Sequence, residues 1–140
     1  MLAAVMGIIT AASMPAFVSY MQSATLKAGA QELATILNRG RSVAIAQNTS
    51  VCVKQAANRV QFVKDVTGAC VGGTVWTGPG TDGAGWFTLQ NSINVISNPQ
   101  VVFNYLGAAT TAGTYTVRNP VNNATLSVIV ALSGRVTIGP

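Results

Sequence analysis

The chain has 140 residues, of which 49% are hydrophobic and only 8% are charged, with a net charge of +5 and no histidine. This length fits one domain with a core of its own, and so low a charge density favours association or membrane contact. The only acids, Glu32, Asp65 and Asp82, lie far apart in sequence, so no metal site, cofactor motif or acid–base pair is predicted. We therefore expect a protein that is not an enzyme and that needs no metal and no cofactor.

The N-terminal segment is uncharged from Met1 to Thr25. As a helix, residues 1–21 would be about 32 Å long, which matches the hydrocarbon core of a bilayer. The segment lacks the basic start and the cleavage site of a signal peptide. We expect a helix that either anchors the chain in a membrane or is buried among copies of itself. Pro15 predicts a kink or a local break near residues 11–15.

Beyond the proline the pattern becomes amphipathic. Apolar or small residues recur at alternating spacings of four and three, at Leu26, Ala30, Leu33, Leu37, Gly40 and Ala44. This period predicts a helix that packs one stripe on the rest of the chain. Asn48 is a suitable C-terminal cap, because asparagine tolerates the left-handed conformation.

From Ser50 onward the apolar residues alternate with a period of two, which predicts strands. We expect a hairpin around residues 55–59 and further strands at 86–90, 94–97, 101–105, 114–118, 125–133 and 135–138. The segment 72–85 is rich in glycine and is predicted to be a surface loop, and 106–113 a turn. In the strand at 125–133 one face carries Leu126, Val128, Val130 and Leu132.

The predicted fold class is α+β, with a long N-terminal helix packed on an antiparallel β-sheet domain. Residues 1–25 form the hydrophobic half of the helix, residues 26–48 its amphipathic half, and residues 49–140 the β domain. The apolar half has no partner within its own chain, so we expect lipid or other subunits to cover it.

The two cysteines, Cys52 and Cys70, have no histidine and no second cysteine pair beside them, which makes a zinc site improbable. Two interpretations stay open: a disulfide formed in an oxidising compartment, or two buried thiols. We favour the disulfide.

The eight basic residues are spread along the chain with no run of three. Affinity for a phosphate backbone needs several basic groups on one surface. The sequence therefore favours a solvated scatter of charge over a dedicated phosphate-binding face.

The chain resembles the type IV pilin-like proteins, in particular the GspH/FimT group of pilins and pseudopilins. The similar motifs lie in order along nearly the whole sequence: Met14-Pro15-Ala16-Phe17 in the apolar helix; Leu33-x3-Leu37-x3-Arg41-Ser42-x-Ala44-Ile45-x2-Asn48-x2-Val51 running into Cys52 and Val53; Gly85-Trp86; Val101-Val102-Phe103 followed by Leu106-Gly107; and Ser133-Gly134-Arg135-Val136. The glutamate that pilins carry on the fifth residue is absent, and the start looks about two helical turns short of the family's first helix.

The resemblance implies a structural subunit, a pilin or pseudopilin, of a type IV pilus or a type II secretion pseudopilus. Its partners would be copies of itself or other pilin-like subunits. It would lie in the inner membrane before assembly and then in an extracellular or periplasmic filament. The assembly helix would use Leu2, Val5, Met6, Ile8, Ile9, Met14, Pro15 and Phe17.

Two alternatives stand beside this interpretation. The first is a minor pilin that binds extracellular DNA for uptake through Arg135 and Arg118, with support from Lys54, Arg59 and Lys64. Some members of the group bind DNA through Gly-Arg-x-Arg, of which Gly134-Arg135-Val136-Thr137 keeps one arginine. The second is a single-span membrane protein with a β domain that never polymerises. Trp76 and Trp86 could stack on bases, but we expect them to anchor the glycine-rich loop.

Overall fold

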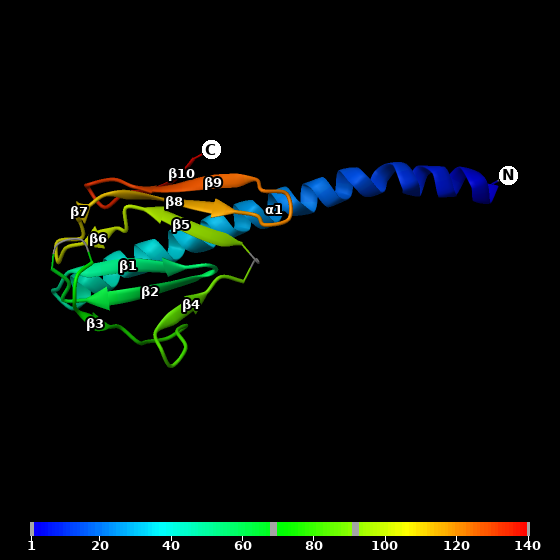
Figure 1. Cartoon of the computed structure of the whole chain (residues 1–140). Helices are drawn as coiled ribbons and strands as arrows, with labels where there is room; N and C mark the ends of the chain where they lie inside the picture. The colour runs from blue at the N-terminus through cyan, green and yellow to red at the C-terminus, as the bar shows by residue number, and fades with distance from the viewer. Residues whose placement is uncertain (1, 68–69, 91–92, 140) are drawn as a thin grey trace.

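The computed structural model describes residues 2–67, 70–90 and 93–139, with side chains from Phe17 onward except Asn98. The helix α1 spans Leu2–Ala46. Its N-terminal part projects from the globular head, and the strands cover its C-terminal part (Figure 1). The expected break near Pro15 is wrong, because α1 continues through that residue. A proline removes one backbone hydrogen bond, and the bonds around it hold the helix together. In the described part of the chain, no helix is long and apolar enough to cross a membrane.

The C-terminal end of α1 matches the expected cap. The helix stops at Ala46, and Asn48 adopts a left-handed φ of 51°. The amide of Thr49 then donates to the carbonyl of Ala44 at 3.1 Å, which satisfies one of the last helical carbonyls. This turn directs the chain back along the helix into the first strand.

Among the described residues, ten strands follow the helix. They are β1 (Val51–Ala56), β2 (Arg59–Lys64), β3 (Thr74–Val75), β4 (Trp86–Thr88), β5 (Asn94–Asn98), β6 (Val102–Phe103), β7 (Ala109–Thr111), β8 (Gly113–Arg118), β9 (Thr125–Val130) and β10 (Val136–Gly139). The predicted hairpin is confirmed as β1 and β2, with Val53 opposite Phe62.

The strands form two antiparallel sheets. The first has the order β3-β2-β1-β6-β7, with β4 also paired to β2, and the second has the order β10-β9-β8-β5. The short strands β3 and β7 lie in segments that we expected to be a loop and a turn. Strands of two or three residues are too short to produce a recognisable alternation. The strand expected to run to residue 133 stops at Val130, so Leu132 lies in a turn and is 65% exposed.

The predicted helix stripe forms the centre of the core. Ala30, Leu33, Leu37 and Ala44 have no exposed surface, and Leu26 keeps 6%. The inner faces of both sheets pack on this stripe through side chains such as Val53, Phe62, Tyr115, Val117, Val128 and Val130. The helix and the two sheets therefore share one core.

Candidate functional site

The exposed apolar segment of α1 just before the head is the clearest surface feature of the described residues. Phe17, Val18, Tyr20 and Met21 are 61%, 49%, 70% and 50% exposed. We call these four residues the stem. In the expected assembly set, Leu2, Val5, Met6, Ile8, Ile9, Met14 and Pro15 have side chains outside the described part, and Phe17 belongs to the stem. Large apolar side chains exposed close together on one segment mark a surface that associates.

The head begins one residue after the stem. The side-chain amide of Asn122 donates to Oε1 of Gln22 at 3.3 Å, and that of Asn119 lies 3.5 Å from the carbonyl oxygen of Gln22. Asn119 is buried and organises the β8–β9 turn by accepting from the amide of Val121 at 2.9 Å. The contact with the head thus starts at Gln22, before the boundary at residues 25 and 26 that the sequence predicted.

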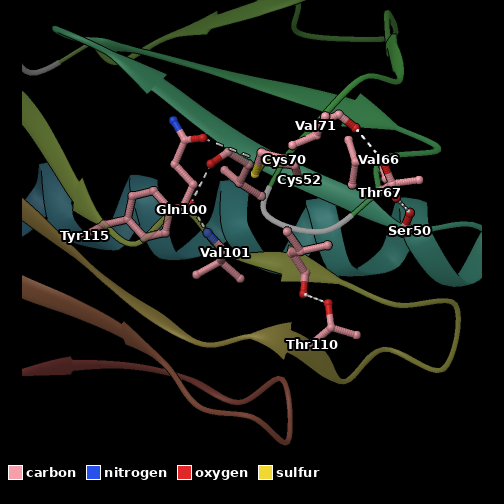
Figure 2. Close-up of a disulfide and its surroundings, with 12 residues drawn as sticks. Ser50, Cys52, Val66, Thr67, Cys70, Val71, Gln100, Val101, Thr110 and Tyr115 are labelled. Atoms are coloured by element: carbon pink, nitrogen blue, oxygen red, sulfur yellow. Dashed lines mark hydrogen bonds between the residues drawn. A yellow bond between two sulfur atoms is a disulfide. The ribbon is translucent and has the colours of Figure 1, made fainter.

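The disulfide is present between Cys52 and Cys70, whose Cα atoms are 5.5 Å apart (Figure 2). Cys52 is fully buried on the face of the first sheet that points away from α1, where it forms a second, smaller core with Val63, Val66 and Val102. Ser50 Oγ donates to the carbonyl of Val66 at 2.9 Å and holds the covering segment in place. The disulfide therefore ties a loop over a sheet face that would otherwise be open to water.

The glycine-rich loop is held to the helix by aromatic contacts. The Trp76 ring stacks on Phe87 with centroids 6.2 Å apart, and the Arg39 guanidinium lies 5.6 Å from the Trp76 centroid and 5.2 Å from that of Phe87. Such cation–π contacts stabilise a half-buried arginine. Arg59 covers Trp86 in the same way at 4.8 Å. Both tryptophans are thus occupied within the chain, as expected for anchors.

Asp82 orders the far end of this loop. Its Oδ1 accepts from the amides of Trp86 at 3.0 Å and Ala84 at 2.9 Å. The bond from Trp86 is the largest cause that lowers the pKa of this exposed carboxyl, with Ala84 and the nearby Arg59 acting in the same direction. In the described ranges, no three His, Cys, Asp or Glu side chains are placed to hold a metal ion.

A family model described as type II transport protein GspH matches residues 29–134, which is most of the head. The chain belongs to the GspH family. Solved structures agree on the fold of this GspH-family chain. It is 17% identical to the minor pseudopilin EpsH from the type II secretion system of Vibrio cholerae, with 81% of this chain and 94% of that chain covered and a TM-score of 0.59.

The type IV minor pilin FimU of Pseudomonas aeruginosa is also similar to the GspH-family chain, at 14% identity and a TM-score of 0.58, with 86% of this chain and 92% of that one covered. At such identities the likeness shows the fold alone. No curated protein sequence matches the chain. The predicted family and fold class are thus confirmed, including the long helix packed on antiparallel sheets.

The two arginines of the DNA-binding alternative lie at opposite ends of the second sheet. In this GspH-family head, Arg118 pairs with Thr125 beside the β8–β9 turn, which is the turn that contacts Gln22. The Arg118 side chain donates to Asn123 Oδ1. Arg135 is exposed and precedes β10, whose first residue Val136 pairs with Val130 at the far end. The intervening strand is about 17 Å long. The structure does not bring the two groups together.

Gly134, next to Arg135, has a steric role in the GspH-family head. Its φ is +86°, and a Cβ on this residue would lie 2.0 Å from the carbonyl oxygen of Gly107 and 3.1 Å from Nε of Arg41. Only glycine fits this position without displacing the backbone of Gly107. Packing therefore accounts for the glycine of the Gly-Arg pair.

The supporting basic residues, Lys54, Arg59 and Lys64, do not cluster around either arginine. Lys64 donates to Gln47 Oε1 at 3.0 Å beside the end of α1, and Arg59 is stacked on Trp86. Lys54 pairs with Gln61 across the β1–β2 hairpin. The basic side chains of the described residues are therefore scattered over the head, as the sequence predicted.

Proposed function

We propose that the chain is a structural subunit of a filament, a pilin or pseudopilin of a type IV pilus or a type II secretion pseudopilus, and that it assembles through its N-terminal helix. The observation that carries the proposal is the stem. Its exposed apolar side chains continue a segment that has no charge from Met1 onward. Membership of the GspH family and the likeness in fold to a minor pseudopilin and a minor pilin support the same function.

The physical reason lies in the surface that the helix leaves open. Burying apolar surface is favourable by about 25 cal/mol per Å², and in the described part of α1 the first buried side chain is that of Leu26. Equivalent helices packed side by side would cover the stem and the segment before it. Before assembly, the inner membrane would provide an equally apolar surrounding for the same segment.

The disulfide supports a location outside the cytoplasm. Disulfides form and persist in the periplasm and at cell surfaces, and they are rare in reducing compartments. The Cys52–Cys70 bond lies in the head, while the uncharged segment is at the other end of the chain. The proposed orientation therefore has the head in the periplasm and, after assembly, in the filament. The chain acts there as a scaffold and not as an enzyme.

Incorporation into filaments tests this proposal. Cells would produce the full chain, its Phe17→Ser/Tyr20→Ser variant, and the control Ile96→Ser, which changes a 54% exposed residue on β5. We expect the stem variant to be at least tenfold depleted from sheared filaments and the control to stay within twofold of the natural chain. Alkylation of thiols in the unfolded, unreduced proteins would show that the natural chain, the stem variant and the control all form the disulfide. Normal incorporation of the stem variant would contradict the proposal.

A further inference from the structure

The end of the head from which the stem projects carries two exposed basic side chains. Arg118 ends β8 beside the β8–β9 turn, and Lys27 follows Gln22 on α1 by five residues, or about 8 Å of helix. The segments that form this end, residues 17–27 and 117–127, contain no acid. This end of the head is therefore positively charged.

The charge of Arg118 is held on the turn by a neutral partner. Its Nε donates to Oδ1 of Asn123 at 3.1 Å, and the amide of Asn123 donates to the carbonyl of Asn119 at 2.8 Å. An amide oxygen accepts hydrogen bonds but carries no net charge, so this contact fixes the guanidinium without cancelling its charge. The first acid along α1, Glu32, lies about 15 Å beyond Gln22.

The β8–β9 turn also presents an apolar side chain. Val121 is 75% exposed, more than any other large apolar side chain of the described residues. Its amide donates to Oδ1 of the buried Asn119 at 2.9 Å, so the turn is ordered. Figure 1 shows this turn, in orange, beside α1 where the helix leaves the head. An apolar side chain next to cations suits a membrane interface, where the first enters the acyl boundary and the cations meet headgroups.

The stem sets the level of this turn relative to a membrane. Tyr20 is 70% exposed, and tyrosine is enriched at membrane–water interfaces because its ring is apolar and its hydroxyl is polar. Gln22 follows about 3 Å farther along the helix and accepts from the side chain of Asn122 in the turn. In the proposed function the uncharged segment before Tyr20 lies in the inner membrane. The β8–β9 turn would then lie at the level of the lipid headgroups.

We propose that, before assembly, the head docks on the anionic lipid surface of the membrane that holds its helix. Val121 enters the interface, and Arg118 and Lys27 contact headgroup phosphates. This inference rests on the proposed function, because it needs the uncharged segment to be in a membrane. The contact fixes the orientation of the head above the membrane, and the subunit gives it up when it enters a filament.

Hydrogen exchange of the full chain in lipid nanodiscs tests the docking. Discs that hold one chain each are made from phosphatidylcholine alone or with phosphatidylglycerol added, so that only the charge of the surface changes. The measured amides are the bonded ones of the turn, Val121, Asn123 and Ala124. The amides of Ala131 and Gly134 in the β9–β10 turn, at the other end of the sheet, are the internal reference.

Each variant has a matched control at the far end of the same sheet. Val121→Ser is compared with Leu132→Ser, which changes a 65% exposed side chain in the β9–β10 turn. Arg118→Gln is compared with Arg135→Gln, since both arginines are exposed. Lys27→Gln repeats the charge test on α1, where the change leaves the bonds of the turn in place. Each chain is judged by the ratio of its exchange rates in the two lipids, so a variant that merely loosens the turn does not count.

In the natural chain we expect exchange at the β8–β9 turn to be about tenfold slower in the anionic discs, because each basic residue near such a surface strengthens attachment about fivefold. The reference amides should not change. Lys27→Gln, Arg118→Gln and Val121→Ser should each reduce the ratio at least threefold, and the two controls should keep it. Molar salt should remove the difference, because it screens exposed charges beyond about 3 Å.

Equal exchange in the two lipids, or an equal loss in Arg135→Gln, overturns the proposal. Protection that appears only in discs with two chains assigns this end of the head to a second copy and also overturns it. Filament incorporation of the same variants separates the docking from the proposed function. A chain that docks but never enters filaments contradicts the filament role alone. A chain that enters filaments while its turn exchanges equally in both lipids contradicts the docking alone.

Discussion

The hydroxyl of Tyr115 joins the two sheets: it donates to the carbonyl of Val53 at 2.6 Å and accepts from the amide of Val101 at 3.0 Å (Figure 2). Tyr115 belongs to β8 in the second sheet, whereas Val53 belongs to β1 in the first. The side chain is fully buried, and this burial raises the pKa of its hydroxyl. One side chain thus satisfies two backbone groups at the line where the sheets meet.

Tyr115→Phe should lower the free energy of unfolding by about 1–3 kcal/mol, because a buried carbonyl and a buried amide lose their partner. Denaturant unfolding followed by circular dichroism measures the change. Tyr105→Phe, at a 54% exposed position, is the matched control and should cost less than about 0.5 kcal/mol. Equal stability of the two variants would show that the hydroxyl is not needed to hold the sheets together.

Replacement of both cysteines, Cys52→Ala with Cys70→Ala, should lower the free energy of unfolding by about 2–4 kcal/mol, because the unfolded chain gains the freedom that the closed loop denied it. Hydrogen exchange should quicken in the described part of the loop around Val66 and Val71, which the bond holds over the sheet. A reductant should reproduce the effect in the natural chain and leave the double variant unchanged. Stabilities that do not respond to reductant would contradict the prediction.

Gly134→Ala should destabilise the head by more than about 2 kcal/mol, because the positive φ is strained for alanine and the new Cβ would overlap the carbonyl of Gly107. Arg135→Ala, the adjacent control, should change the unfolding free energy by less than about 0.5 kcal/mol. If both variants unfold at the same denaturant concentration as the natural chain, the steric role assigned to Gly134 is wrong.

The DNA-binding alternative can be tested with the same Arg135→Ala variant. We expect no submicromolar binding of labelled duplex near physiological salt, because Arg135 and Arg118 lie at opposite ends of the sheet. Weak binding at low salt would reflect only the net charge of +5. Tight binding that persists at the higher salt and is lost in the folded variant would favour the DNA-binding alternative.

The lowered pKa of Asp82 predicts an acid-dependent contribution to stability. The ionised carboxylate is favoured in the folded state, so its contribution is present above its unfolded pKa of about 3.8 and is lost as the pH falls through the lower folded value. Asp82→Asn should therefore be less stable than the natural chain at pH 6, and the difference should shrink below pH 4. A difference that is constant across this range would show that the charge of Asp82 plays no part.

A chain that starts at Gln22 should give a soluble, folded head, because every buried helix residue of the described part follows that position. A chain that starts at Thr25 lacks the contacts of Gln22 with Asn119 and Asn122, and should be less stable by about 1 kcal/mol. Thermal unfolding of the two fragments compares them. An insoluble or unfolded longer fragment would mean that the stem is part of the head's core.

Local sequence patterns predicted the elements that are long enough to show a repeated spacing of apolar residues. The helix stripe from Leu26 to Ala44, the cap at Asn48 and the β1–β2 hairpin all depend on neighbours in sequence, and the structure contains each of them. The division into two sheets could not be predicted in this way, because it depends on which distant strands pair.

The same holds for the sites. The cysteine count favoured the disulfide, but the contact between Tyr115 and Val53 joins residues 62 positions apart that no spacing rule links. The packing of Ile45, at the end of α1, on the turn at Gly107 likewise joins residues that lie far apart in sequence. Arg135 was a candidate because it stands in a partial Gly-Arg-x-Arg motif, and Arg118 was a second basic residue. Only the strand register shows that the two lie at opposite ends.

The continuity of α1 determines how the head would carry a mechanical load. The helix that forms the stem is the same helix that lies beneath both sheets, with buried side chains from Leu26 to Ala44. Tension applied along the stem would therefore act parallel to that contact and load its rows of side chains together in shear. A helix attached only at the edge of a domain would instead be peeled away one contact at a time. In the proposed filament, this geometry would let the head transmit tension from one neighbouring subunit to the next without a hinge in the load path.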